Sequence, residues 1–233
     1  MKTILIIPAY NEQDNIVNTI LDIKRNADNV DYVVINDCST DATKSVLKAK
    51  KANYLDLPVN LGIGGGVQAG YLYALEHGYD IAIQFDGDGQ HDAAYIKDLI
   101  APIESGQADV VIGSRFIQKE GFQSSFMRRL GIKFLSKLIY ILCGVQVSDV
   151  TSGMRAVNKK MIREFSNNYA QDYPEPEAIL ASGLLGARIV EVPVRMHERQ
   201  NGVSSINTLK SIYYMIKVTL ALVIGRLTAR KER

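Results

Sequence analysis

Two carboxylates one residue apart, Asp86 and Asp88, are the strongest chemical signal in this sequence. They belong to the motif Asp86-Gly87-Asp88-Gly89-Gln90, which follows an apolar run typical of a buried strand. Mg²⁺ and Mn²⁺ prefer oxygen ligands and often bridge to substrate phosphates, and the glycines allow a tight loop. The motif therefore predicts a metal site with Asp86, Asp88 and Gln90 as ligands; the alternative is a solvated Asp-Gly turn.

A glycine-rich segment, 60–70, is the second signal. Val67 stands where a dinucleotide fingerprint has its third glycine, and the segment lacks the Gly-Lys-Ser/Thr end of a P-loop. We interpret it as the start of a helix that packs closely on a sheet beside a nucleotide. Close packing without any ligand is the alternative.

The elements that must position these motifs are short apolar runs alternating with helical patterns. Strands are predicted at 4–7, 32–35, 54–57, 81–85 and 110–112. Helices are predicted at 15–25, with Asn11 and Asp14 as a cap, and at 40–51, 64–77 and 93–104. Such alternation predicts an α/β fold with a mainly parallel sheet covered by helices on both faces. Ligands bind beyond the carboxyl ends of parallel strands, and polar clusters follow four of the predicted strands, at 8–12, 36–39, 86–88 and 113–115.

The composition is that of a folded domain. The chain has 233 residues, of which 47% are hydrophobic and 22% charged, and its net charge is +2, so neither disorder nor a nucleic-acid partner is indicated. Two cysteines without metal spacing, Cys38 and Cys143, favour a reduced, cytoplasmic setting. The first apolar run is too short for the core of a signal peptide. No stretch reaches the roughly 18 apolar residues of a membrane span.

Several motifs in order resemble family 2 glycosyltransferases of the GT-A fold: 8–12, 36–41, 60–62 and 86–90. Further motifs resemble the branch of dolichyl-phosphate mannose synthases and bacterial polyprenyl-phosphate glycosyltransferases: 149–155, 191–194 and 199–205. The resemblance runs from about Lys2 to about Ile206. It implies a Rossmann-like GT-A catalytic domain over 1–206 and a C-terminal amphipathic helix with a basic tail over 207–233.

The resemblance also implies roles for individual residues. The nucleotide-sugar site would consist of Pro8, Tyr10, Glu12, Asp37, Gly62, Asp86, Arg115, Arg199 and Ser205. The metal on the diphosphate, Mg²⁺ or Mn²⁺, would be held by Asp86, Asp88 and Gln90. The catalytic residues would be Asp149, Asp88 and Arg129, with Arg128 as the alternative to Arg129 beside the acceptor phosphate. Asp149 would act as an orienting group or as a base, with Glu175 and Glu177 as weaker candidates. Ser205 stands where many members carry a basic residue.

The implied reaction is an inverting transfer of a sugar from a nucleotide diphosphate sugar to a polyprenyl phosphate, such as undecaprenyl phosphate, for cell-wall or surface glycan assembly. N-acetylglucosamine and glucose are preferred as the sugar and uridine as the nucleoside. A phosphate acceptor is already largely ionised at pH 7, so placement and charge neutralisation matter more than proton removal. The alternatives are a GDP-mannose-dependent polyprenyl-phosphate mannosyltransferase, a sugar nucleotidyltransferase and a non-catalytic membrane adaptor.

Two amphipathic stretches, 126–147 and 208–226, place basic residues beside apolar ones, as interfacial helices do. With the resemblance, they predict a peripheral protein at the cytoplasmic face of the cell membrane. Ordinary core or dimer helices are the alternative. The sequence leaves open a small membrane-protein partner or a homo-oligomer.

Overall fold

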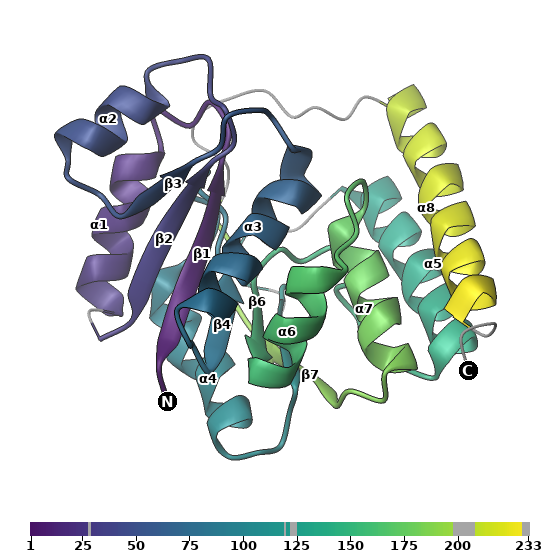
Figure 1. Ribbon diagram of the computed structural model, residues 1–233. Helices are drawn as coiled ribbons and strands as arrows, with labels where there is room; N and C mark the ends of the chain where they lie inside the picture. The colour runs from purple at the N-terminus through teal and green to yellow at the C-terminus, as the bar shows by residue number, and fades with distance from the viewer. Residues whose placement is uncertain (28, 119, 122–124, 198–207, 230–233) are drawn as a thin grey trace.

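A seven-stranded sheet with the order β3-β2-β1-β4-β6-β5-β7 organises the molecule (Figure 1). The computed structural model describes residues 1–27, 29–118, 120–121, 125–197 and 208–229. The strands are β1 (Thr3–Ala9), β2 (Asp31–Asn36), β3 (Tyr54–Asp56), β4 (Ile81–Gln84), β5 (Val110–Ser114), β6 (Arg155–Asn158) and β7 (Ile189–Pro193). The pairs β1–β2, β1–β4, β2–β3 and β5–β7 are parallel, whereas β6 is antiparallel to both β4 and β5. The predicted mainly parallel sheet is therefore confirmed.

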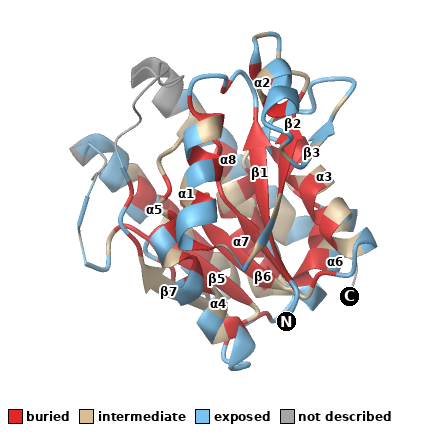
Figure 2. Ribbon diagram, turned by 90° about the vertical axis from the view of Figure 1, so that its left-hand side faces the viewer, coloured by how far each residue is buried: buried red, intermediate tan, exposed pale blue. Residues whose placement is uncertain are grey.

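Helices cover both faces of this sheet (Figure 1). One face packs against α1 (Ile16–Asn26), α2 (Thr43–Ala49) and α4 (Ile96–Glu104), which follows the short helix η1 (Ala93–Tyr95). The other packs against α3 (Gly62–Glu76), α5 (Phe126–Cys143), α6 (Lys159–Asn167), α7 (Pro174–Leu184) and α8 (Thr208–Ala229). The strands β1, β4 and β5 are buried along their whole length, whereas the edge strands β3 and β7 are partly exposed. Many of the exposed residues lie on the outer faces of the helices (Figure 2).

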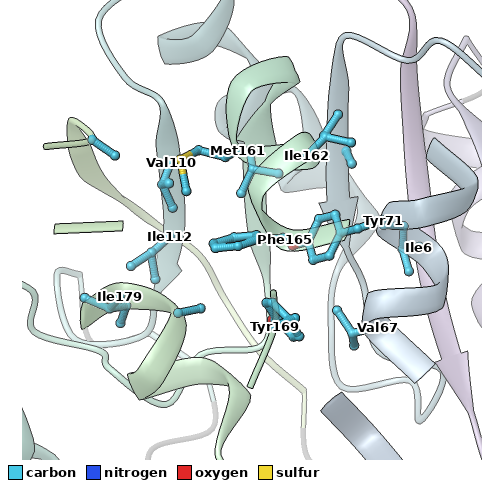
Figure 3. Close-up of a cluster of buried hydrophobic side chains, with 14 of the residues drawn as sticks. Ile6, Val67, Tyr71, Val110, Ile112, Met161, Ile162, Phe165, Tyr169 and Ile179 are labelled. Carbon is cyan, nitrogen blue, oxygen red and sulfur yellow. The ribbon is translucent and has the colours of Figure 1, made fainter. Parts of the chain in front are cut away.

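Alternation along β1 divides the core into two clusters. Ile4 and Ile6 point to the cluster under α3 and α6, while Leu5 and Ile7 point to the cluster under α1 and α4. Three aromatic rings, those of Tyr71, Phe165 and Tyr169, connect α3 to α6, with centroids 5.1 to 5.4 Å apart (Figure 3). This packing fixes the position of α3, whose first turn borders the site described below.

Two local predictions are wrong. Asn11 does not cap the first helix, because α1 begins at Ile16 after Asn15. Asn11 instead adopts a positive φ of 57°, and its Oδ1 accepts a hydrogen bond from the Thr40 N–H at 2.8 Å. The loops after β1 and β2 are thereby joined. The helix predicted at 126–147 ends earlier, at Cys143, because Gly144 takes a left-handed conformation.

The helices α5, α7 and α8 contact one another and form a group beside the β5–β7 part of the sheet (Figure 1). Val218 and Leu222 of α8 are fully buried, so this helix is packed along one side. Among the residues that the structure describes, no helix has the length and apolarity needed to cross a membrane.

Candidate functional site

A cavity of about 390 Å³ opens at the carboxyl ends of β1, β2 and β4. It is lined by Pro8, Ala9, Tyr10, Glu12, Asp37, Asn60, Gly62, Ile63, Gly66, Asp86, Gly87 and Asp88. Seven residues predicted for the nucleotide and the metal meet here, although they are scattered over eighty positions of the chain: Pro8, Tyr10, Glu12, Asp37, Gly62, Asp86 and Asp88. Asn60 and Gly66 were not predicted as lining residues, although the glycine-rich segment contained the signal.

Two buried acids form one wall of this cavity. Glu12 is 8% exposed, and its Oε2 accepts a hydrogen bond of 2.7 Å from Nδ2 of Asn15. Asp37 is 4% exposed, and its Oδ1 accepts a hydrogen bond of 2.7 Å from the N–H of Leu61. Carboxylates held in this way are fixed acceptors for hydroxyl or base N–H groups.

The glycine-rich segment packs closely, as predicted, and also borders the cavity. Gly62, with a φ of +75°, and Gly66 border the cavity at the start of α3. At Gly64 a Cβ would lie 2.1 Å from the carbonyl oxygen of Ala170, and at Gly70 2.1 Å from Cγ2 of Ile6. These glycines therefore let α3 approach both the sheet and the segment after α6.

The metal motif lies at the end of β4, and hydrogen bonds hold its loop in place. Asp86 donates its backbone N–H to Nδ1 of the buried His91 at 3.0 Å, and Oδ1 of Asp88 accepts the N–H of Gln90 at 3.0 Å. The segment after β7 lies against this loop, because His197 donates its N–H to the carbonyl of Gln90 at 2.8 Å. His91, for which a place near the metal was considered, thus supports the loop backbone.

The donor set fits a hard divalent cation shared with a substrate. Asp86 and Asp88 both border the cavity, and neither side chain is fully buried. Within the described residues there is no group of three or more His, Cys, Asp and Glu side chains that could hold a metal. Mg²⁺ and related ions commonly take only one or two carboxylates and complete their coordination with water and substrate phosphates. Asp86 and Asp88 suit that mode. Gln90, the third predicted ligand, is not among the residues that line the cavity, and its Nε2 donates to the carbonyl of His197 at 3.4 Å.

A second cluster centres on Asp149, which is completely buried. Its carboxylate receives Nε and Nη2 of Arg115 at 2.7 Å each, and the Arg115 backbone N–H at 3.2 Å. Glu191 in turn accepts the N–H of Asp149 at 2.9 Å. This arrangement favours the orienting role of Asp149 over that of a base, because its oxygens are already engaged by a cation.

The first turn of α5 carries two arginines with different surroundings. Arg128 interacts electrostatically with Arg115, Asp149 and Glu175, and partial burial together with Arg115 lowers the pKa of its guanidinium. Arg129 instead lines a separate groove of about 790 Å³ with Lys133 and Lys137. Arg128 thus interacts with the Asp149 cluster, and the groove of Arg129 also borders that cluster through Phe116 and Ser148, the chain neighbours of Arg115 and Asp149.

Two further residues of the region received little or no weight from the sequence. Glu175, at the start of α7, is partly buried, and this burial together with the negative charge of Asp86 raises its pKa. Arg155 begins β6 and is 1% exposed, although a lone arginine is usually a surface residue. Arg155 is the last residue of the motif 149–155, and that was the available signal. The predicted residues Arg199 and Ser205 lie outside the described residues.

Comparison with known proteins points to one family. A model of the family described as Glycosyl transferase family 2 matches residues 4–166. The chain is 28% identical to an undecaprenyl-phosphate mannosyltransferase of Micrococcus luteus, over 89% of this chain and 88% of that protein. It is 31% identical to a UDP-N-acetylglucosamine–dolichyl-phosphate N-acetylglucosaminyltransferase of Methanococcus voltae, over 82% of this chain and 84% of that protein.

A solved structure with the same fold is that of glucosyl-3-phosphoglycerate synthase from Mycobacterium tuberculosis in complex with Mn²⁺ and UDP-glucose. The TM-score is 0.73 at 20% identity, covering 97% of this chain and 78% of that one. The predicted GT-A architecture is thereby confirmed.

Proposed function

The chain belongs to glycosyl transferase family 2, and we propose that it transfers a hexose from a nucleotide diphosphate sugar to a polyprenyl phosphate. The observation that carries this proposal is the continuity of two sites along one sheet edge. Fixed acceptors for a nucleoside and the carboxylates of a metal site share one cavity. Beside them, Arg115 and Arg128 form a cationic cluster around Asp149. The cavity with its metal site suits a nucleotide diphosphate donor, and the cationic cluster suits an anionic acceptor.

Each group has a role in this reaction. Glu12 and Asp37 would bind the nucleoside, and Asp86, Asp88 and Gln90 would hold Mg²⁺ or Mn²⁺. The bound cation would neutralise charge on the departing diphosphate. Transfer inverts the configuration at the sugar carbon, with the acceptor phosphate as the nucleophile.

On the acceptor side, Arg128 binds the acceptor phosphate, and Asp149 orients Arg115 toward the same region. A phosphate monoester is largely ionised at neutral pH, so this site needs cations and correct placement more than a base.

The donor sugar is the finer part of the proposal. We favour a uridine nucleotide carrying N-acetylglucosamine or glucose, with GDP-mannose as the alternative. The two relatives named above differ in this respect, since the name of one specifies UDP-N-acetylglucosamine and that of the other a mannosyl transfer. Both names contain a polyisoprenoid phosphate acceptor.

The membrane surface is approached by α5 and α8. Each helix exposes an apolar stripe at helical spacing: Met127, Leu130, Phe134 and Ile141 on α5, and Tyr213, Ile216, Leu220, Ile224 and Leu227 on α8. Beside the stripe of α5, the bases Arg129, Lys133 and Lys137 recur every four residues. Apolar insertion next to positive charge suits a peripheral protein on an anionic bilayer, here the cytoplasmic face of the cell membrane.

A panel of radiolabelled nucleotide sugars tests the proposal. Each donor is incubated with the full chain, Mn²⁺ and undecaprenyl phosphate, and lipid-linked label is extracted into organic solvent. Label in the organic phase with one donor supports the proposal and identifies the sugar. Formation of a nucleotide sugar from a sugar phosphate and a nucleoside triphosphate would instead identify a nucleotidyltransferase. Vesicle binding without turnover of any donor would identify an adaptor.

A further inference from the structure

Glu191 is a charged residue in the middle of an otherwise apolar edge strand, β7. Its neighbours Val190 and Val192 pack against the core cluster under α1 and α4, whereas Ile189 packs against the cluster on the other face of the sheet. Side chains alternate along a strand, so Glu191 points to the same face as Ile189. A carboxylate that is partly removed from water needs hydrogen-bond donors to offset its lost hydration.

The loop before β6 supplies these donors. Oε2 of Glu191 accepts the backbone N–H of Ser148 at 2.8 Å, and Oε1 accepts the backbone N–H of Asp149 at 2.9 Å. The hydroxyl of Ser148 donates to the same carboxylate, at 2.8 Å from Oε1. Hydrogen bonds to an ionised acceptor are stronger than those between neutral groups. Glu191 therefore fixes the backbone of this loop at Ser148 and Asp149.

The loop held by Glu191 leads directly to the cationic cluster. The carboxylate of Asp149 pairs with Nε and Nη2 of Arg115 at 2.7 Å each. Arg115 follows β5, the strand that pairs with β7, and Ile112 of β5 lies opposite Glu191 in the register. A continuous chain of contacts thus runs from the edge strand through Asp149 to Arg115. Asp149 determines where the guanidinium lies, and Glu191 determines where Asp149 lies.

We infer that Glu191 is a positioning residue for the acceptor phosphate: it holds Asp149, which orients Arg115, and does not itself touch the substrate. The inference rests on the proposed function, which places an anionic acceptor at this cluster. Two effects of removing the Glu191 charge have opposite signs. Charge alone would strengthen the binding of an anion, because like charges repel. Loss of orientation would weaken it, and this is the result that the positioning role requires.

Binding of a phosphate monoester decides between these two effects. The probe is a water-soluble prenyl phosphate of short chain, titrated calorimetrically into the full chain with Mn²⁺ and UDP. Glu191→Gln should bind it about tenfold more weakly than wild type, as for one lost hydrogen bond to a charged group. The dissociation constant for UDP should stay within about twofold, because the nucleoside lies in a separate cavity. Equal or tighter probe binding by this variant, or none by wild type, would overturn the inference.

Asp109→Asn is the matched control, because Asp109 joins the same two strands at their other end. Asp109 precedes β5, and its Oδ2 accepts the N–H of Arg188, the residue before β7, at 2.8 Å. This variant should lose stability and still bind the probe as wild type does. Probe binding that weakens as much as in Glu191→Gln would mean that loosening of the strand pair is sufficient, and would overturn the positioning role.

A double-mutant cycle with Arg115→Lys shows whether the effect passes through Arg115. Lysine keeps the charge but lacks the planar fork that Asp149 binds. In this background Glu191→Gln should weaken probe binding much less than in wild type, because the orientation is already lost. An equal loss in both backgrounds would place the action of Glu191 elsewhere and overturn the inference.

A shorter carboxylate gives a second test of the same contact. Glu191→Asp keeps the charge but lacks one methylene group, so it should also weaken probe binding, and it replaces Glu191→Gln if that variant no longer binds UDP. Wild-type probe binding by Glu191→Asp would contradict a role that depends on reach. None of these measurements involves sugar transfer, so they remain decisive even if no donor yields lipid-linked label.

Discussion

Arg115 and Asp149, 34 residues apart in the chain, form a bidentate ion pair. Nε of Arg115 lies 2.7 Å from Oδ2 of Asp149, and Nη2 lies 2.7 Å from Oδ1. Asp149 is fully buried and Arg115 is 6% exposed, so the pair is shielded from water. Nη2 of Arg115 also donates to Oγ1 of Thr151 at 2.9 Å. The loop after β5 and the loop before β6 are thereby fixed to each other beside Arg128.

Asp149→Asn should destabilise the protein by about 3–5 kcal/mol, because it leaves the Arg115 charge buried and unpaired. Urea unfolding measures the change. Asp80→Asn, which breaks the exposed pair of Asp80 with Lys159 at 3.3 Å, is the control and should cost less than about 1 kcal/mol. Lost transfer activity with unchanged stability in Asp149→Asn would contradict the pairing role and favour a general base.

Asp37→Ala should weaken UDP binding by about 1–3 kcal/mol, because donors on the ribose or base lose a fixed acceptor. Calorimetric titration with UDP and Mn²⁺ provides the measurement. Asp41→Ala, in the same loop but outside the cavity lining, is the control. An unchanged dissociation constant for Asp37→Ala would exclude this residue from the nucleoside site.

A pH dependence of stability is expected from Asp109, far from the site. Hydrogen bonds from Arg188, at 3.0 Å each, lower the pKa of Asp109 from 3.8 to about 2 in the folded protein. A folded-state pKa below the unfolded one adds stability above pH 3.8, and this contribution is lost as the pH falls toward 2.

Asp109→Asn should therefore be less stable than wild type at pH 7, by roughly 1–2 kcal/mol, since the exposed Arg188 is partly screened. The difference in unfolding free energy between the two proteins should decrease as the pH falls from 3.8 toward 2. Denaturant unfolding at each pH measures this difference. A gap that stays constant from pH 7 to pH 2 would mean that the ionised carboxylate contributes nothing.

Ile216→Glu together with Leu220→Glu should reduce binding to anionic vesicles, because both side chains are exposed on α8 and would insert into the bilayer. Vesicle flotation of the full chain measures this, and Leu72→Glu, at a similarly exposed position on α3, is the control. Binding should also weaken in high salt, since bases near the surface are screened. Equal flotation of both variants and wild type would instead make the α8 stripe a surface for a protein partner.

The sequence predicted the cavity because its residues follow strands. Pro8, Asp37 and Asp86 each stand just beyond a buried apolar run, and the ends of parallel strands meet at one edge. The glycine-rich segment was likewise predicted to pack closely at this edge. Gly62 borders the cavity, and Gly64 allows the close packing of α3.

Local sequence patterns could not predict contacts between segments that are distant in the chain. Arg115 and Asp149 were assigned to separate roles, because nothing in either motif indicates that they pair. The strand β6 was not predicted, since it is only four residues long and begins with Arg155, whose burial depends on α7 above it. Asn11 was predicted to cap a helix because Asp14 follows it by three residues. In the structure its side-chain oxygen instead accepts a hydrogen bond from the N–H of Thr40 in the neighbouring loop.

The central claim is metal-dependent transfer of a hexose to a polyprenyl phosphate, and one assay tests it most directly. Wild type and Asp88→Ala are incubated with labelled UDP-glucose or UDP-N-acetylglucosamine, undecaprenyl phosphate and Mn²⁺, with and without EDTA. Wild type should produce lipid-linked label only in the absence of EDTA, and Asp88→Ala should produce almost none while melting at the wild-type temperature. Full transfer by wild type in EDTA, or by Asp88→Ala, would contradict the metal site. Absence of lipid-linked label from wild type with these donors and with GDP-mannose would contradict the proposed reaction.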